Sequence, residues 1–395
     1  MNKFFYLIKM EKEIETLNRN IYIPILKKTS YISPIKIYIT NNLKLIIISI
    51  FTIIYIYYYL ITNNKFGSNY ILPKIPYKID TQFINKLKEI IKNEEDIIEN
   101  ELLSKHTTFK LGGPAKIYII PKTVSQIIQI INLCNNYKVE YFILGNGSNL
   151  LVSDQGYNGV IIQINEKYFS NLKVKKENED NYILIVGGGK LMKTLSIEAC
   201  LLSLTGLEDI IDIPGTIGGG IIMNASFRGS GLKNALIKVK AITPEGKVIV
   251  INKEECGLIH RGSILKSKKY IIIEATFSLK KGDQILIQKT MTNNTKRRYE
   301  KQPMYFGSAG CFFIWDHGKN GSMYNKYKES NLVGYRIGNA MIYTYNIAFI
   351  VNLGNASAME VMKIVKYIEK IMKEKYKIEI KREVIVIGSF NNIDN

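Results

Sequence analysis

The chain has 395 residues, which is room for two or three domains of about 100–200 residues each. Hydrophobic residues make up 46% of it, which excludes a disordered protein. The net charge is +20, but lysine and arginine are spread along the chain and are not clustered with aromatic residues, so we expect no nucleic-acid partner. The cysteines form no CxxC pair and the histidines are scattered, so we expect no metal site, and isolated thiols favour a reducing compartment.

Residues 1–84 differ from the rest and are expected to form an N-terminal extension. Residues 45–62 carry no charge and are rich in Ile and Tyr, and a run of this length is barely sufficient to span a bilayer. We expect a membrane anchor or a targeting segment, with a buried helix as the alternative. Lys and Arg are more frequent before the run than after it, so the positive-inside rule would place the N-terminus on the cytosolic side and the main body across the membrane. A bipartite organelle-targeting sequence would look similar.

The globular part begins near residue 85 with a pattern typical of a β-α-β unit. Residues 80–100 are predicted to form one or two short helices, and residues 115–121 a strand. Thr123 is expected to begin a helix with Gln126 as its capping-box partner. The apolar stripe of this helix fits one buried face: Val124, Ile127, Ile128, Ile131 and Leu133.

A strand at residues 141–144 then leads into the loop Gly145-Asn146-Gly147-Ser148-Asn149. Two glycines bring backbone N–H groups together with no side chain in the way, which suits a pyrophosphate. An ordinary turn between two strands is the alternative, because glycine is the usual turn residue.

A second glycine-rich stretch covers residues 206–220. In it Pro214-Gly215 fixes a turn, Thr216 can cap a helix or bond a phosphate, and residues 218–220 permit close approach of the backbone. Strands are predicted around it at 156–164, 182–186, 236–243, 248–251 and 271–279, with a helix at 191–202 and a charged hairpin tip at 175–180.

The charged residues 296–303 are interpreted as a domain boundary. In the last part Ser357 and Glu360 predict a capping box for a long helix. Residues 382–388 are predicted to form the strand that closes this domain.

Several stretches occur together in an order and spacing that resemble the UDP-N-acetylenolpyruvoylglucosamine reductases, the MurB family, in its shorter class without an inserted substrate-domain loop. The similarity covers about residues 85–390. It is carried by residues 144–152, 206–219 with Met223-Asn224, Arg261 with Ser263, Gln302-Pro303, 308–313, 334–338, 349–352 and 382–388.

The resemblance implies an α+β fold. An FAD-binding domain of the PCMH or vanillyl-alcohol-oxidase type, made of two α+β subdomains, would span residues 85–282, and a C-terminal α+β substrate domain residues 295–390. It also implies that NADPH reduces FAD, and that the enolpyruvyl UDP-sugar then enters the same cleft and becomes UDP-N-acetylmuramate, a peptidoglycan precursor. A cytoplasmic monomer is implied as well.

The resemblance also implies which residues hold the cofactor, mainly through backbone donors. Gly145, Asn146, Gly147, Ser148 and Asn149 would lie on the FAD pyrophosphate. Gly215, Thr216 and Gly218 would lie along the flavin, and Thr108 and Gly112 would contribute from the preceding loop.

Three residues match the family's catalytic positions. Arg261 would stabilise the charge that hydride addition creates beside the substrate carboxylate, since arginine stays charged and offers a planar fork of donors. Cys311 would donate the proton, because a thiol loses its proton readily. Glu383 would assist by hydrogen bonding.

Each of the three also has a structural interpretation. Arg261 could be a surface arginine after a strand, and Cys311 a small buried apolar residue. Glu383 could be a strand-end carboxylate paired with Arg382 or Lys381.

The chain departs from the family pattern at positions that face the substrate. Ile314, Trp315 and Asp316 stand where the family has Lys-Asn-Pro, and Tyr343 and Asn346 where it has Ser and His. Trp315 could instead stack on uracil or sugar. Two alternatives stay open: a flavin oxidoreductase with another substrate, and a membrane-tethered flavoprotein without turnover.

Overall fold

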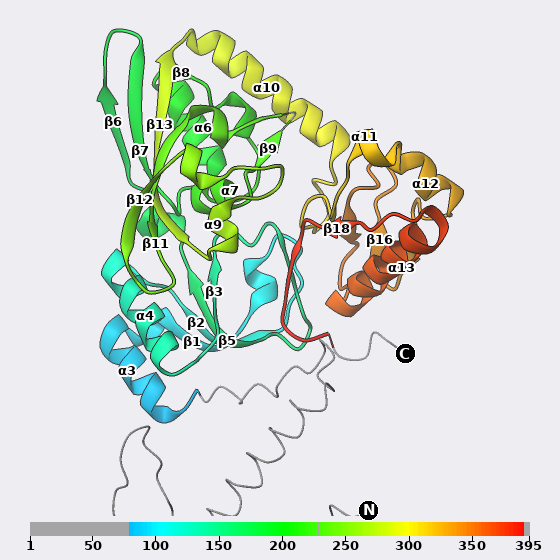
Figure 1. The fold of residues 1–395 in the computed structure, drawn as a ribbon, viewed down its shortest axis with the longest axis horizontal. Coiled ribbons are helices and arrows are strands. Elements are labelled where there is room, and N and C mark those ends of the chain that lie inside the picture. The colour runs from blue at the N-terminus through cyan, green and yellow to red at the C-terminus, as the bar shows by residue number, and fades with distance from the viewer. Residues whose placement is uncertain (1–78, 228, 391–395) are drawn as a thin grey trace, which may run out of the picture. The chain divides into compact units, whose positions relative to one another are not determined.

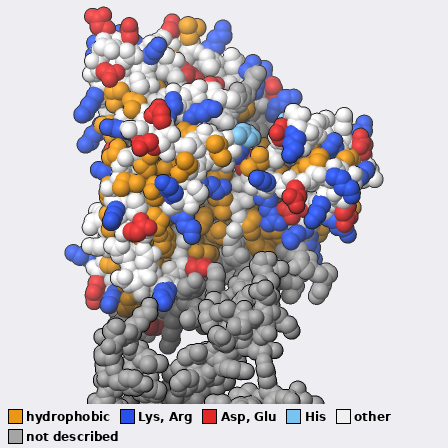
Figure 2. All heavy atoms as spheres, viewed as in Figure 1, with side chains coloured by type: hydrophobic (Ala, Val, Ile, Leu, Met, Phe, Trp, Pro, Cys, Tyr) orange, Lys and Arg blue, Asp and Glu red, His pale blue; other side chains and the backbone are white. Residues whose placement is uncertain are grey.

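The structure is a computed structural model that describes residues 79–227 and 229–390 (Figure 1). Residues 45–62, predicted to anchor or target the chain, lie outside the described residues. Within these two ranges, no helix has both the length and the apolar character that a membrane span requires. Lys and Arg are interspersed with Asp and Glu on the face that Figure 2 shows.

The first sheet is four-stranded, in the order β1 (Ile97–Leu102), β2 (Pro114–Ile119), β5 (Tyr157–Gln163), β3 (Tyr141–Leu144). β2, β5 and β3 are parallel, while β1 is antiparallel to β2. Helices α3 (Thr81–Ile91) and α4 (Val124–Asn136) pack on it through their Phe, Leu and Ile side chains.

The helix α4 has the predicted N-cap. The Thr123 hydroxyl accepts a hydrogen bond from the N–H of Gln126 (3.2 Å), and the Gln126 side chain accepts one from the N–H of Lys122 (2.7 Å), one residue before the cap. The prediction of one or two short helices in residues 80–100 is wrong only at its end, from Ile97 onward. Only a short 3-10 turn, Glu94–Asp96, follows α3, and the chain then forms β1 because its backbone pairs with β2.

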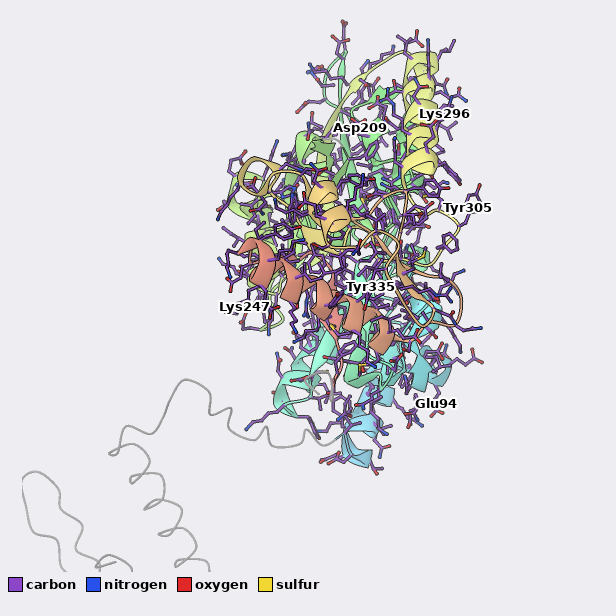
Figure 3. All side chains as sticks on the ribbon, turned by 90° about the vertical axis from the view of Figure 1, so that its right-hand side faces the viewer. Glu94, Asp209, Lys247, Lys296, Tyr305 and Tyr335 are labelled. Atoms are coloured by element: carbon purple, nitrogen blue, oxygen red, sulfur yellow. The ribbon has the colours of Figure 1, made fainter. Side chains whose placement is uncertain are left out.

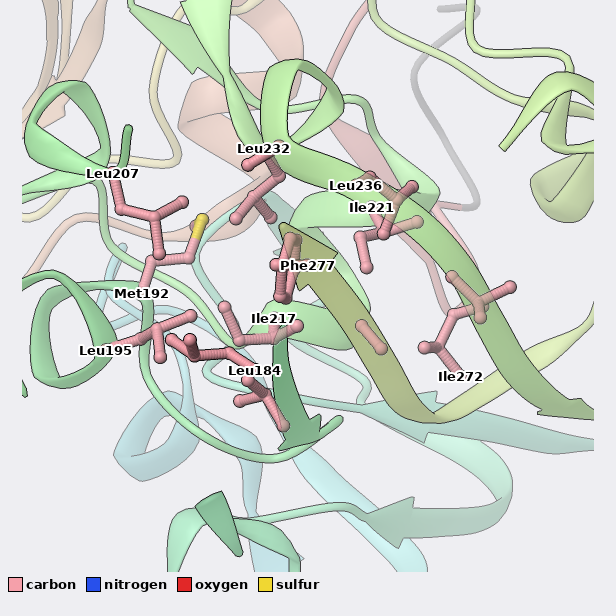
Figure 4. Packing of buried hydrophobic residues seen from close by; sticks show 14 of the residues in the cluster. Leu184, Met192, Leu195, Leu207, Ile217, Ile221, Leu232, Leu236, Ile272 and Phe277 are labelled. Atoms are coloured by element: carbon pink, nitrogen blue, oxygen red, sulfur yellow. The ribbon is translucent and has the colours of Figure 1, made fainter. Parts of the chain in front are cut away.

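The second sheet is antiparallel and runs in the order β12 (Val248–Asn252), β11 (Leu236–Ile242), β13 (Ile271–Lys281), β7 (Asn181–Gly187), β6 (Leu172–Lys176). β8 (Leu204–Thr205) also pairs with β13. β6 and β7 form the predicted hairpin with the charged tip. Helices α6 (Met192–Leu201) and α7 (Ile217–Ile222) cover the sheet, and Leu184, Ile217 and Phe277 meet in the core between them (Figure 4).

Helix α10 (Gln284–Lys301) leads from this sheet to the last part of the chain (Figure 1). There the strands β15 (Arg336–Ile337), β16 (Ala340–Ile342) and β17 (Ile350–Asn352) form a small sheet. Helix α13 (Ala358–Tyr376) packs on that sheet, and Figure 3 shows Tyr335 beside it. The predicted capping box of Ser357 and Glu360 at the start of α13 is present.

The predicted closing strand at residues 382–388 is two strands with different partners. β18 (Lys381–Arg382) pairs with β14 (Phe313–Ile314), whereas β19 (Ile385–Ile387) pairs in parallel with β4 (Leu150–Val152). The chain end therefore returns to the strand that follows the first glycine loop. A local apolar pattern predicts a strand but does not name its partner, which is why the split was missed.

The remaining elements are short. They are η2 (Leu103–His106), α5 (Glu166–Phe169), η3 (Glu208–Ile210), β9 (Ser226–Phe227), β10 (Ser230–Gly231), α8 (Leu232–Ala235), η4 (Glu254–Cys256), α9 (Ile264–Ser267), α11 (His317–Asn320) and α12 (Met323–Glu329).

Candidate functional site

A cavity of about 1280 Å³ lies where the two sheets and the C-terminal part meet. It exceeds the roughly 300–1,000 Å³ of most small-molecule sites. Its lining contains both glycine-rich stretches and all three residues predicted to be catalytic. Of the residues predicted to hold the cofactor, Gly112 alone is outside the lining; it abuts the Val152 side chain.

The two glycine-rich stretches touch each other along the cavity. The Ser148 hydroxyl donates to the carbonyl of Pro214 (2.8 Å). A Cβ at Gly145 would lie 2.7 Å from the Thr216 hydroxyl, and Gly147 has a φ of +61°, so a side chain is disfavoured at both positions. Ser148 therefore ties the first glycine loop to the turn at Pro214-Gly215.

Thr216 takes the first of its two predicted roles. Its hydroxyl accepts the N–H of Gly219 at 3.2 Å, as the N-cap of α7. Thr108 lines the cavity as well, and its hydroxyl donates to the carbonyl of Ser308 (2.8 Å), which ties the first loop to the segment that carries Cys311.

Arg261 lies in a tight turn whose two ends, Ile259 and Gly262, bond each other through their backbones. Its φ is +58°, which costs a non-glycine residue roughly 1–2 kcal/mol. The Asn224 side chain donates to the carbonyl of Ile259 (2.8 Å) and holds the turn in place. Backbone strain of this kind, fixed by neighbours, is a feature of functional sites.

The Arg261 guanidinium points to Glu383. Its Nε lies 3.2 Å from the Glu383 Oε1, and its Nη1 donates to the carbonyl of Ser226 (3.4 Å). Arg382 instead pairs with Glu369 at 2.6 Å, so the pairing of Glu383 with Arg382 that the sequence left open is not formed. Burial raises the pKa of Glu383, and the positive charges of Arg261 and Lys266 oppose this rise.

Cys311 is partly buried beside this ion pair, on a segment held from both sides. Its neighbour Phe312 donates its N–H to the carbonyl of Ala348 (2.8 Å) and accepts the N–H of Glu383 (2.9 Å). Burial and the negative charge of Glu383 raise the pKa of the Cys311 thiol to about 11, although Arg261 and Arg298 lower it. The thiol therefore keeps its proton at neutral pH.

Arg298 is a cavity residue that the sequence analysis missed, because residues 296–303 were interpreted as a boundary. It is 6% exposed, its guanidinium lies 5.4 Å from the centre of the Phe227 ring, and its Nε is buried with no hydrogen-bond partner among the described residues. Burial lowers its pKa, while Asp212 and Cys311 raise it. Arg298 follows Met291 and Asn294 on the buried face of α10, but polar residues at these positions leave no apolar periodicity that would mark the face in the sequence.

The idea that Trp315 stacks on a ligand is wrong. Trp315 is 8% exposed in the core of the C-terminal part, its Nε1 donates to the carbonyl of Gly321 (2.9 Å), and it is absent from the cavity lining. Asp316 caps α11 by accepting the N–H of Lys319 (3.1 Å). Tyr305 is a lining residue of the cavity that is 88% exposed, and Figure 3 shows it at the edge of the molecule.

Two family models match the chain. Residues 115–252 match an FAD binding domain, and residues 302–387 match the C-terminal domain of UDP-N-acetylenolpyruvoylglucosamine reductase. The UDP-N-acetylenolpyruvoylglucosamine reductase of Clostridium novyi is 35% identical over 305 residues, which cover 77% of this chain and 96% of that protein. The chain belongs to the UDP-N-acetylenolpyruvoylglucosamine reductase family.

Other members of this reductase family agree with that assignment. The protein of that name from Alkaliphilus metalliredigens is 37% identical over 298 residues, covering 75% of this chain and 95% of that protein. The crystal structure of the reductase from Thermus caldophilus has a TM-score of 0.61 and 31% identity, and covers 73% of this chain and 98% of that one. The predicted family and α+β fold class are confirmed.

Proposed function

We propose that this chain is a reductase that uses FAD and NADPH to convert UDP-N-acetyl-3-O-(1-carboxyvinyl)-glucosamine to UDP-N-acetylmuramate in peptidoglycan precursor synthesis. Family membership supports the reaction. The observation that carries it for this chain is that Arg261, Cys311 and Glu383 line the same cavity as the two glycine-rich stretches.

The cavity walls fit FAD. The loop Gly145–Asn149 offers backbone donors to a pyrophosphate, with Thr108 and Gly112 in the segment behind it. Gly215, Thr216 and Gly218 line the cavity, and the two glycines would let a flavin ring approach the backbone closely. The chemistry that FAD supplies when bound is the transfer of a hydride from NADPH to the enolpyruvyl double bond.

Two cations, the partly buried Arg261 and the buried Arg298, suit the charge that develops on the substrate. Hydride addition leaves negative charge next to the substrate carboxylate, and fixed donors in a site shielded from water stabilise such charge. Arg261 provides one guanidinium, held by Glu383. Arg298, which lines the same cavity, provides a second.

Cys311 completes the reaction by protonating the carbon that did not receive hydride. Its raised pKa keeps the thiol protonated at neutral pH, and the developing carbanion is a far stronger base than a thiolate. Glu383 bonds Arg261 through its carboxylate, which orients the guanidinium while the charge develops.

We propose the domain limits 85–282 and 295–390 for the FAD-binding and substrate-binding parts, with α10 as the connection. We also propose that the functional unit is a monomer.

The N-terminal extension, residues 1–84, is proposed to anchor or target a catalytic part that in this family is cytoplasmic. A fluorescent protein fused to residues 1–84 tests this, since a diffuse cytosolic signal would contradict it.

The experiment for the activity has two steps. The full chain is first reconstituted with FAD and its visible spectrum recorded; absence of bound flavin would contradict the cofactor assignment. NADPH oxidation is then followed with the enolpyruvyl UDP-sugar. If NADPH reduces the flavin but no sugar product forms, a flavin oxidoreductase with a different substrate is favoured.

A further inference from the structure

Asn149 joins the first glycine loop to the segment that carries Glu383. Its side-chain Nδ2 donates to the carbonyl oxygen of Glu383 (3.2 Å), and its own carbonyl accepts the N–H of Ile385 (3.0 Å). Immediately after it, β4 pairs in parallel with β19. The backbone of Glu383 is therefore fixed to the first glycine loop.

The other side of Glu383 is fixed to the Cys311 segment. The N–H of Glu383 donates to the carbonyl of Phe312 (2.9 Å), the residue after Cys311, and Arg382 lies opposite Phe313 in the β14–β18 pair. A shift of the Glu383 backbone therefore reaches Cys311 through a single hydrogen bond.

We propose that Asn149 is a positioning residue, which holds Glu383 against Arg261 and beside Cys311 and so couples the pyrophosphate loop to the proton donor. This inference rests on the proposed function for the roles of the loop and of Cys311. Its geometry concerns the chain itself and can be tested without cofactor.

The charges around Cys311 predict the direction in which the pKa of its thiol should change when the coupling is broken. Glu383 raises the pKa of the thiol, whereas Arg261 and Arg298 lower it, and Lys266 acts on Glu383 from the same cavity. If the Glu383 backbone is released, its carboxylate withdraws from Cys311 and leaves Arg261 without its partner. Both changes make the thiol more acidic.

The test measures the pH profile of Cys311 alkylation by iodoacetamide in the cofactor-free full chain, read by mass spectrometry at that residue. The thiolate is the reacting form, and the other three cysteines are buried. Asn149→Ala should lower the apparent pKa by about 0.5 unit or more, which roughly triples the thiolate fraction at pH 8. Glu383→Gln removes the carboxylate charge altogether and should therefore give the largest decrease in the apparent pKa of Cys311.

The matched control is Asp154→Ala. Asp154 joins the same two parts of the chain by accepting the N–H groups of Ala358 and Met359, but it does not bond Glu383. Its alkylation profile should match that of the unaltered chain. If Asn149→Ala does not fold, as judged by urea unfolding, Asn149→Ser provides a smaller perturbation with the same expected sign.

An unchanged apparent pKa in the Asn149 variant would overturn the proposal. Equal shifts in the Asn149 and Asp154 variants would also overturn it, because they would indicate general loosening. Titration of the unaltered chain with FAD is the separate check on the proposed function. If the chain fails to bind FAD, the alkylation result can still be interpreted, because it is obtained without cofactor.

Discussion

At the scale of single residues, Cys311 is the proposed proton donor of the second half-reaction. Replacing it with Ala should slow product formation by about 10²–10⁴-fold, the usual contribution of a general acid. Flavin reduction by NADPH should not change, because that step needs no proton from Cys311. Stopped-flow absorbance separates the two half-reactions, and survival of both would show that another group donates the proton.

The pH dependence follows from the same thiol. Burial and Glu383 raise the pKa of Cys311 to about 11, so the donor is protonated below that pH and lost above it. The rate of the second half-reaction should therefore show no loss from this group between pH 7 and 9 and should fall as pH approaches 11. A fall centred near pH 8.5, the ordinary value of a free cysteine, would contradict the buried, Glu383-facing environment.

Arg298 is the residue whose role was visible only in the fold. Arg298→Ala should lower kcat/KM for the enolpyruvyl sugar by roughly 30- to 5,000-fold, since loss of a buried charged partner costs about 2–5 kcal/mol. Arg298→Lys keeps the charge but lacks the planar fork of donors that a guanidinium offers, and it should recover only part of the loss. A lysine variant as active as the unaltered chain would show that charge alone matters there.

At the scale of elements, the cap of α13 links two parts of the chain. Both oxygens of Asp154 accept N–H groups of the first turn, from Ala358 and Met359 at 2.8 and 2.9 Å. Asp154→Ala should lower the free energy of unfolding by about 0.5–2 kcal/mol, as measured by urea titration. Asp316→Ala, at the cap of the short surface helix α11, is the control and should cost less.

The sequence predicted elements with a strong local signal. The stripe of α4, its N-cap at Thr123 and the capping box of Ser357 and Glu360 are all present. β1 was missed because it exists through pairing with β2, and residues 382–388 were read as one strand because pairing with distant partners splits them.

At the scale of the whole molecule, the described residues build one cavity from segments far apart in the chain. Resemblance to a family grouped Arg261, Cys311 and Glu383 in advance, and all three line that cavity. Residue patterns alone could not do so, because the positions of Arg298 on the inner face of α10 and of Glu383 beside Asn149 depend on how the chain folds back.

The cavity is lined by residues of both sheets and of the C-terminal part. A ligand that binds there only in the folded chain stabilises the fold by mass action. FAD at 100 times its Kd should raise the free energy of unfolding by about 2.7 kcal/mol, measured by urea titration with and without FAD. Riboflavin lacks the pyrophosphate and, at the same concentration as FAD, is the matched ligand control. Equal stabilisation by both would mean that the first glycine loop does not bind the pyrophosphate.

The central claim is that reduced flavin in this cavity passes hydride to the enolpyruvyl sugar while Cys311 supplies the proton. The most direct measurement reduces the FAD-loaded full chain with one equivalent of NADPH, without oxygen, and then adds the enolpyruvyl UDP-sugar. We expect the flavin absorbance near 450 nm to return, with UDP-N-acetylmuramate formed in equal amount, and neither to occur at the normal rate in Cys311→Ala. Flavin that stays reduced after the sugar is added would contradict the account.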